Sequence, residues 1–103
     1  MPYKDKSADW LFFAESDLQS AQAIFEEKIY HTASFHAHQT VEKSLKAFLV
    51  HRQNRAPKTH SISSLFYNCV KLGLKGLNEK EVIFIDQFYF PTRYPDTLPG
   101  SLP

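Results

Sequence analysis

The sequence contains a single cysteine, Cys69, and only three glycines among 103 residues. One cysteine cannot form an intrachain disulfide, so a secreted, disulfide-stapled design is excluded and a reducing compartment fits best. No stretch approaches the roughly 18 consecutive apolar residues that a membrane-spanning helix needs. The first ten residues also lack the basic start and apolar run of a signal peptide. We therefore expect a soluble, cytoplasmic protein.

Several chemical motifs are also missing. The sequence has no glycine-rich phosphate loop, no paired-cysteine metal site, no HExxH and no serine nucleophile elbow. His36 is followed four residues later by Thr40, and His38 by Glu42, so no clean pair of metal ligands is present. We expect neither a metal site nor a cofactor. We interpret His38 as a semi-buried residue that packs against a neighbouring helix through a hydrogen-bonded ring nitrogen.

The composition that remains is that of one small globular domain. Apolar residues make up 43% of the sequence and charged residues 22%, which is an ordinary globular balance. Aromatic residues reach 15%, enough to fill a small core with bulky rings. A chain of this length has room for one core. We expect a single domain over residues 1–103, of which about 91–103 form an irregular, proline-rich tail.

Four segments show the spacing of an amphipathic helix, with apolar residues recurring at steps of three and four. The expected helices cover residues 7–28 and 31–52, a short segment ending near Gly73, and a fourth segment stopped by Pro91. No alternating β-branched run is present from which a sheet could form. Because short connections place successive helices side by side, we expect an all-α, up-and-down antiparallel bundle of about four helices.

Residues that cap helices stand before three of these segments. Ser7 is expected to cap the first helix, Thr59 or Ser61 the third, and Asn78 the fourth. Within the second helix, Glu42 precedes a lysine by one turn, which predicts an ion pair along the helix.

The net charge is only +1, but it is unevenly distributed. Residues 31–60 contain five lysines and arginines against the single acid Glu42, a local net charge of +4. The five cations are Lys43, Lys46, Arg52, Arg55 and Lys58. Such a cluster can attract phosphate groups, although a solvated helix end is an alternative explanation.

Arg55 and His60 lie five positions apart in the string RAPKTH. An arginine that clamps a phosphate, beside an imidazole that moves protons, is sufficient to cleave RNA through its own 2′-hydroxyl without a metal. In the alternative interpretation, Arg55 is a solvated loop residue and His60 belongs to the start of the third helix. The spacing alone leaves both interpretations open.

The segment FYFPTRYPD places Arg93 between prolines and beside Tyr89, Phe90 and Tyr94. Proline fixes its own backbone dihedral, and a guanidinium among aromatic rings can stack on a base or grip a phosphate. Alternatively, Arg93 and Asp96 tie this loop to the bundle through charge-assisted hydrogen bonds.

Four strings, in this order, make the sequence similar to the HEPN family, the higher eukaryotes and prokaryotes nucleotide-binding domains. The strings are ADWLFFAESDL, FHAHQTVEKSLKAFL, THSISSLF and YFPTRYPD. The resemblance implies a bundle of four or five helices that is commonly a homodimer. It also implies a nearby gene for a minimal nucleotidyltransferase, in a two-part system resembling toxin and antitoxin. The same domain type occurs at the C-terminus of sacsin.

The resemblance leaves three functional interpretations. The first is a binding module for a nucleotide, an RNA phosphate or a nucleotidyltransferase partner, with candidate phosphate-binding residues Lys43, Lys46, Arg52, His60, Arg93 and Tyr94. The second is a metal-independent endoribonuclease toxin using Arg55 and His60, since some HEPN branches use an arginine and a histidine four to six residues apart. Here Arg55 is followed by apolar Ala56, where active members place a polar residue.

The third interpretation is a purely structural dimerisation domain. HEPN proteins continue into a final helix after the RYPD segment, whereas this sequence ends at Pro103. We therefore expect either that the final helix is missing from this sequence or that the groove it would fill is covered by a second copy of the chain.

Overall fold

A computed structural model of the chain describes residues 6–87. These residues form four helices and no strand. The helices are α1 (Ser7–Glu26), α2 (Tyr30–Gln53), α3 (Ile62–Lys71) and α4 (Glu79–Asp86). The predicted all-α bundle is confirmed. Pro91 and the predicted proline-rich tail over 91–103 lie outside the described residues.

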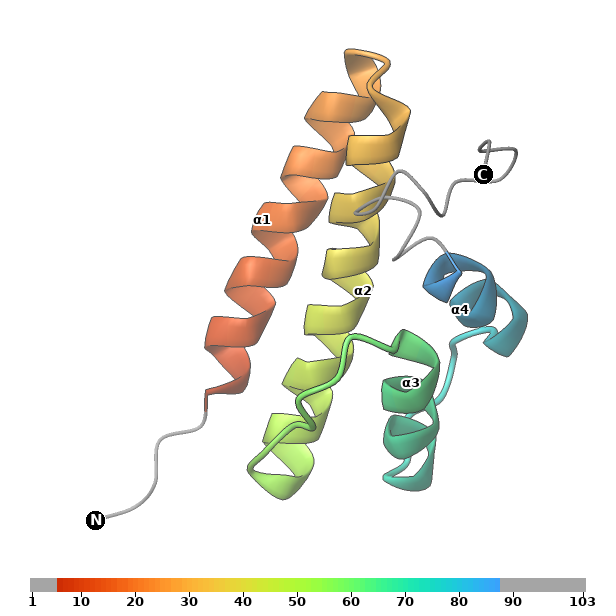
Figure 1. Cartoon of the computed structure of the whole chain (residues 1–103). Helices are drawn as coiled ribbons and strands as arrows, with labels where there is room; N and C mark the ends of the chain where they lie inside the picture. Colours follow the sequence, from red (N-terminus) through yellow and green to blue (C-terminus); the bar gives the residue numbers. More distant parts are fainter. Residues whose placement is uncertain (1–5, 88–103) are drawn as a thin grey trace.

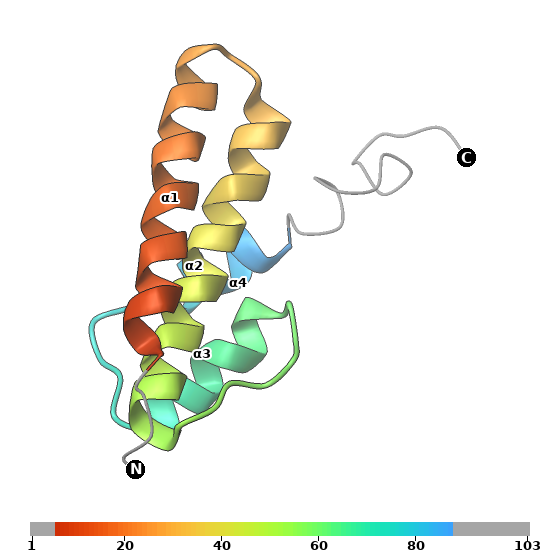
Figure 2. The ribbon, with the colours of Figure 1, turned by 90° about the vertical axis from the view of Figure 1, so that its left-hand side faces the viewer.

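The helices pack in sequence order, α1 against α2, α2 against α3, and α3 against α4. The two long helices form an antiparallel hairpin (Figure 1). The two short helices lie beside α2 and leave α1 uncovered on its outer side (Figure 2). This arrangement brings the loop after α2 next to α3.

The starts of the helices confirm two predicted caps and correct a third. Ser61 precedes α3, and its hydroxyl accepts a hydrogen bond from the N–H of Ser64. Asn78 precedes α4 and accepts from two N–H groups of the first turn. The predicted Ser7 cap is wrong. Lys6 is the N-cap residue of α1, because its carbonyl already accepts the first helical hydrogen bonds, and Ser7 lies inside the helix.

Residues with positive φ follow three of the helices: Lys28 after α1, Asn54 after α2 and Gly73 after α3. Asn54 follows α2 with φ 68°, a left-handed conformation that asparagine tolerates better than most residues. Gly73 follows the C-cap of α3 with φ 102°, as its position in the sequence predicts. The left-handed residue at Asn54 turns the chain away from the axis of α2 and directs the loop toward α3.

The main core lies where α2, α3 and α4 meet. Its fully or almost fully buried residues are Leu45, Leu49, Ile62, Leu65, Phe66, Cys69 and Val82. Burying a large aliphatic or aromatic side chain contributes about 1.5–3 kcal/mol, so this cluster can hold the short α3 in place although ten residues alone make only a marginal helix. The core therefore fixes both ends of the loop between α2 and α3.

Candidate functional site

Three cations are exposed around the C-terminal end of α2. Arg52 lies in the last turn of the helix, while Arg55 and Lys58 lie in the loop that follows. The guanidinium carbon of Arg52 lies 5.1 Å from the ring centre of Phe48. None of the three cations pairs with a carboxylate among residues 6–87, so their charges face solvent without a partner anion.

The other two cations of the basic segment are neutralised inside the bundle. Lys43 forms an ion pair with Asp17 of α1. Lys46 forms the predicted ion pair with Glu42, with 3.0 Å between Nζ and Oε2, and its ammonium lies 5.5 Å from the ring centre of Trp10. These two predicted phosphate ligands therefore already have carboxylate partners.

His60 is exposed but held by a buried carboxylate. Its Nδ1 lies 3.2 Å from both carboxylate oxygens of Glu42. The side chain of His60 is 60% exposed, whereas that of Glu42 is only 4% exposed. The contact orients the imidazole at the surface, which is the arrangement of a general base and the group that positions it.

His38 and Asp86 form a second polar contact between helices. His38 is fully buried, and its Nε2 lies 3.4 Å from Oδ1 of Asp86. Burial lowers the pKa of His38, since the charged form loses its hydration. The predicted packing of His38 against a neighbouring helix is confirmed, with α4 as the neighbour, but His38 is fully buried and not semi-buried as predicted.

Asp86 also caps α3 from outside that helix. Its carboxylate accepts hydrogen bonds from the N–H groups of Ile62 and Ser63 and from the hydroxyl of Ser61. Burial alone would raise the pKa of Asp86, but the hydrogen bonds from Ser63, Ile62 and His38 hold it below its usual value. The start of α3, and with it the end of the basic loop, is thus anchored to α4.

A polar groove of about 510 Å³ lies between the basic loop and the last turn of α3. It is lined by Gln53, Arg55, Ala56, Pro57, Asn68, Lys71 and Leu72. We call it the Arg55–Lys71 groove. Two of its residues are cations, two carry amides and none is an acid. His60 is not among its lining residues, so the structure places the two residues of the predicted catalytic pair in different surroundings.

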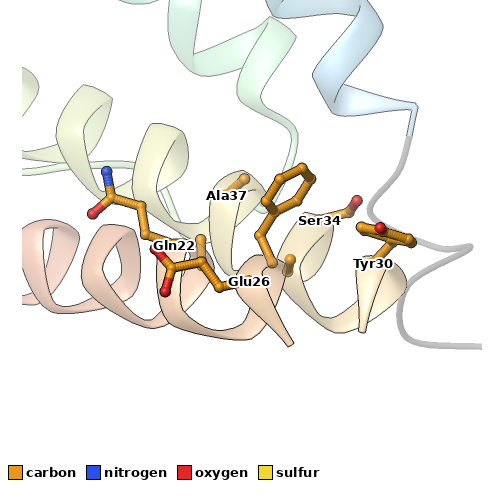
Figure 3. Close-up of a pocket in the computed structure, with 8 residues that line it drawn as sticks. Gln22, Glu26, Tyr30, Ser34 and Ala37 are labelled. Carbon is orange, nitrogen blue, oxygen red and sulfur yellow. The ribbon is translucent and has the colours of Figure 1, made fainter. Parts of the chain in front are cut away.

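An apolar hollow of about 380 Å³ lies at the other end of the hairpin (Figure 3). Gln22 and Glu26 of α1 and Tyr30, Ser34 and Ala37 of α2 border it. A larger hollow of about 610 Å³ lies near the start of α1. Its lining includes Leu11, Ser44, Ala47, Phe48, Leu74 and Leu77. Residues of α1 and α2 line both hollows, and the segment between α3 and α4 also lines the larger one.

Sequence reasoning reached only part of this site. It found Arg52, Arg55 and His60 but not Asn68 and Lys71, which lie one turn apart on α3. This spacing indicates that the two side chains share one face of α3. It does not indicate that the loop after α2 lies beside that face. The predicted ligands Arg93 and Tyr94 lie outside the described residues.

Within residues 6–87, no group of three or more His, Cys, Asp or Glu side chains is arranged as metal ligands would be. In the same part of the chain, no helix is both long and apolar enough to cross a membrane.

A family model described as the HEPN domain matches residues 7–101 of the chain. The match covers nearly the whole sequence and all four helices. No curated protein and no solved structure matches the chain.

Proposed function

Because the chain belongs to the HEPN family, we propose that it is a binding module for the phosphate groups of nucleotides or RNA. Family membership indicates a nucleotide- or RNA-related function in general. The observation that supports phosphate binding is the exposed set Arg52, Arg55 and Lys58 at the end of α2, none of which pairs with a carboxylate among residues 6–87. Exposed cations without partner carboxylates can bind an anion without first breaking an ion pair.

Binding of this kind depends on salt. Each cation that neutralises a phosphate releases condensed counterions, so the affinity for RNA falls as the salt concentration rises. Three participating cations predict a slope of about −2 in a plot of log affinity against log salt for a single strand.

Fluorescence anisotropy with a labelled single-stranded RNA, with ATP and GTP as competitors, tests the proposal. Replacing Lys58 or Arg52 by glutamine should weaken binding and flatten the salt dependence. Lys80→Gln, at an exposed position of α4, changes the net charge equally and serves as the matched control. The proposal is wrong if RNA, ATP and GTP all fail to bind at low salt, or if Lys80→Gln weakens binding as much as Lys58→Gln does.

We also propose that the chain is a homodimer, with the open side of the α1–α2 hairpin as its interface. Leu11, Leu18 and Phe25 recur at intervals of seven along α1 and are 52%, 44% and 60% exposed. Fourteen residues of helix span about 21 Å. Leu11 lines one hollow of the hairpin and Phe25 lines the other.

We propose that this surface pairs with the same surface of a second copy. In an antiparallel copy, Leu11 at one end of α1 would face the smaller hollow at the opposite end, where alanine and serine make up most of the α2 side. A two-fold axis near Leu18 generates both contacts at once, as an isologous interface requires. Leu18→Lys would bring two ammonium groups together at this axis and should give a monomer by light scattering. Val70→Lys, at an exposed position of α3, should leave the dimer intact.

A minimal nucleotidyltransferase is the partner we propose for this module, in a two-part system resembling toxin and antitoxin. The support is the HEPN family membership of the chain. Purification of the tagged chain from its native cells, followed by mass spectrometry, should recover such an enzyme. Recovery of the chain alone, from cells that express a nucleotidyltransferase of this type, would contradict the proposal.

The contact between Glu42 and His60 favours one alternative, a metal-independent endoribonuclease. In this alternative His60, positioned by Glu42, moves protons and Arg55 stabilises the phosphate. Wild-type protein should then cut RNA in the presence of EDTA, and His60→Ala should abolish the cleavage. If both proteins leave the RNA intact, the enzyme alternative is eliminated while the binding proposal stands.

A further inference from the structure

The Arg55–Lys71 groove combines the end of α2, the basic loop and the last turn of α3. Gln53 is the last residue of α2, Arg55 and Pro57 belong to the loop, and Lys71 is the last residue of α3. Its volume of about 510 Å³ lies within the range of small-molecule sites, which is about 300–1,000 Å³. The groove is therefore large enough for a ligand the size of a nucleotide, and not only for a bare anion.

The electrostatics of the groove favour an anion despite the helix ends nearby. The C-termini of α2 and α3 each contribute about half a negative charge. Arg55 and Lys71 contribute two positive charges, both are exposed, and neither pairs with a carboxylate in the described part of the chain. The balance is about one net positive charge, so a phosphate is attracted.

The remaining lining residues match the other parts of a nucleotide. Asn68 lies three residues before Lys71, on the same face of α3. The side-chain N–H of Gln53 donates to the carbonyl of Arg55 at 3.2 Å, which fixes the amide and leaves its oxygen as an acceptor. Amides pair with base edges, and Pro57 and Leu72 supply apolar surface for a base or sugar. An acidic peptide would use the cations but not the amides.

We propose that this groove binds one nucleoside monophosphate, either free or as a unit of single-stranded RNA, with its phosphate on Arg55 and Lys71 and its base edge on Asn68 and Gln53. This inference rests on the proposed function, because it names the place and the ligand of the phosphate-binding module. It differs from the proposed function in its dependence on Asn68 and Lys71 of α3.

Isothermal titration calorimetry with AMP, UMP, inorganic phosphate and a short single-stranded RNA tests the inference. Lys71→Gln should weaken binding of all four probes about tenfold, the effect of losing one charged hydrogen bond. Asn68→Ala should weaken binding of AMP, UMP or RNA but leave inorganic phosphate unchanged. Lys80→Gln is again the matched control. Lys71 is exposed and Asn68 is partly exposed, and circular dichroism with thermal melting verifies that the variants fold.

The outcomes separate the two proposals. If wild-type protein binds RNA but Lys71→Gln and Asn68→Ala bind as Lys80→Gln does, the groove assignment is overturned and the module stands. If no probe binds the wild type, both are overturned. If RNA binds but AMP and UMP do not, and the two variants still weaken RNA, the nucleotide in the groove is a unit of RNA.

Discussion

The buried ion pair between Glu42 and Lys46 leads to a quantitative prediction about stability. The two side chains are only 4% and 8% exposed, and Nζ lies 3.0 Å from Oε2. Glu42→Gln keeps the shape of the side chain but removes its charge, which leaves the Lys46 ammonium buried without a counterion. Breaking a buried pair in this way costs about 3–5 kcal/mol.

The lower part of that range applies here. The Lys46 ammonium also lies 5.5 Å from the ring centre of Trp10, and this contact with the ring remains in the variant. A loss of about 3 kcal/mol is a large fraction of the 5–15 kcal/mol that stabilises an ordinary domain. At about 4–8 °C for each kcal/mol, Glu42→Gln should lower the Tm by more than about 10 °C.

Urea unfolding followed by circular dichroism measures this loss of unfolding free energy. Glu15→Gln, at an exposed position of α1, is the control and should change the unfolding free energy by no more than about 0.5 kcal/mol. The double variant Glu42→Gln, Lys46→Met removes both charges. Its loss of unfolding free energy should be smaller than the sum of the losses of the two single variants by at least about 1 kcal/mol. Strict additivity, or a Glu42→Gln variant as stable as the control, would refute the idea that a stranded ammonium is the cause.

Three further predictions concern the polar and thiol groups of the core. Asp86→Ala should destabilise the domain by about 1–3 kcal/mol in urea unfolding, because the N–H of buried Ile62 loses its acceptor. The free energy of unfolding should fall as the pH drops below about 6.5, the ordinary pKa of histidine. Folding lowers the pKa of His38, so the unfolded chain binds more protons than the folded one in this range. His38→Gln should therefore reduce the change of unfolding free energy between pH 7 and 5. The thiol of Cys69 is buried, and burial raises its pKa to about 11, so in the native protein it should react with Ellman's reagent only as fast as the domain opens. Rapid reaction without denaturant would contradict this prediction.

Periodicity and capping rules predicted most of the helical framework, since these features are local in sequence. Ser61 and Asn78 cap helices as expected, and Glu42 pairs with Lys46 one turn later. The Ser7 cap failed because the preceding Lys6 supplies the first acceptor through its backbone, for which no side-chain signal exists. Local rules therefore miss a helix start that uses backbone atoms alone.

Contacts between distant parts of the chain were beyond such rules. Glu42 meets His60 across 18 positions, and His38 meets Asp86 across 48. Neither pair has a spacing that reveals it, because each depends on how the helices pack. The sequence therefore revealed the +4 segment but not which of its cations remain exposed.

The positions of the exposed cations distinguish a stabilising role from a binding role. A cation near a helix C-terminus interacts favourably with the helix dipole, but the effect fades beyond the last turn. It can therefore account for Arg52 in α2 and Lys71 in α3. It does not account for Arg55 and Lys58, which lie beyond the last turn of α2 and pair with no carboxylate among residues 6–87. Neither the helix dipole nor an ion pair in the described residues gives a reason for these two charges, whereas the proposed phosphate binding does.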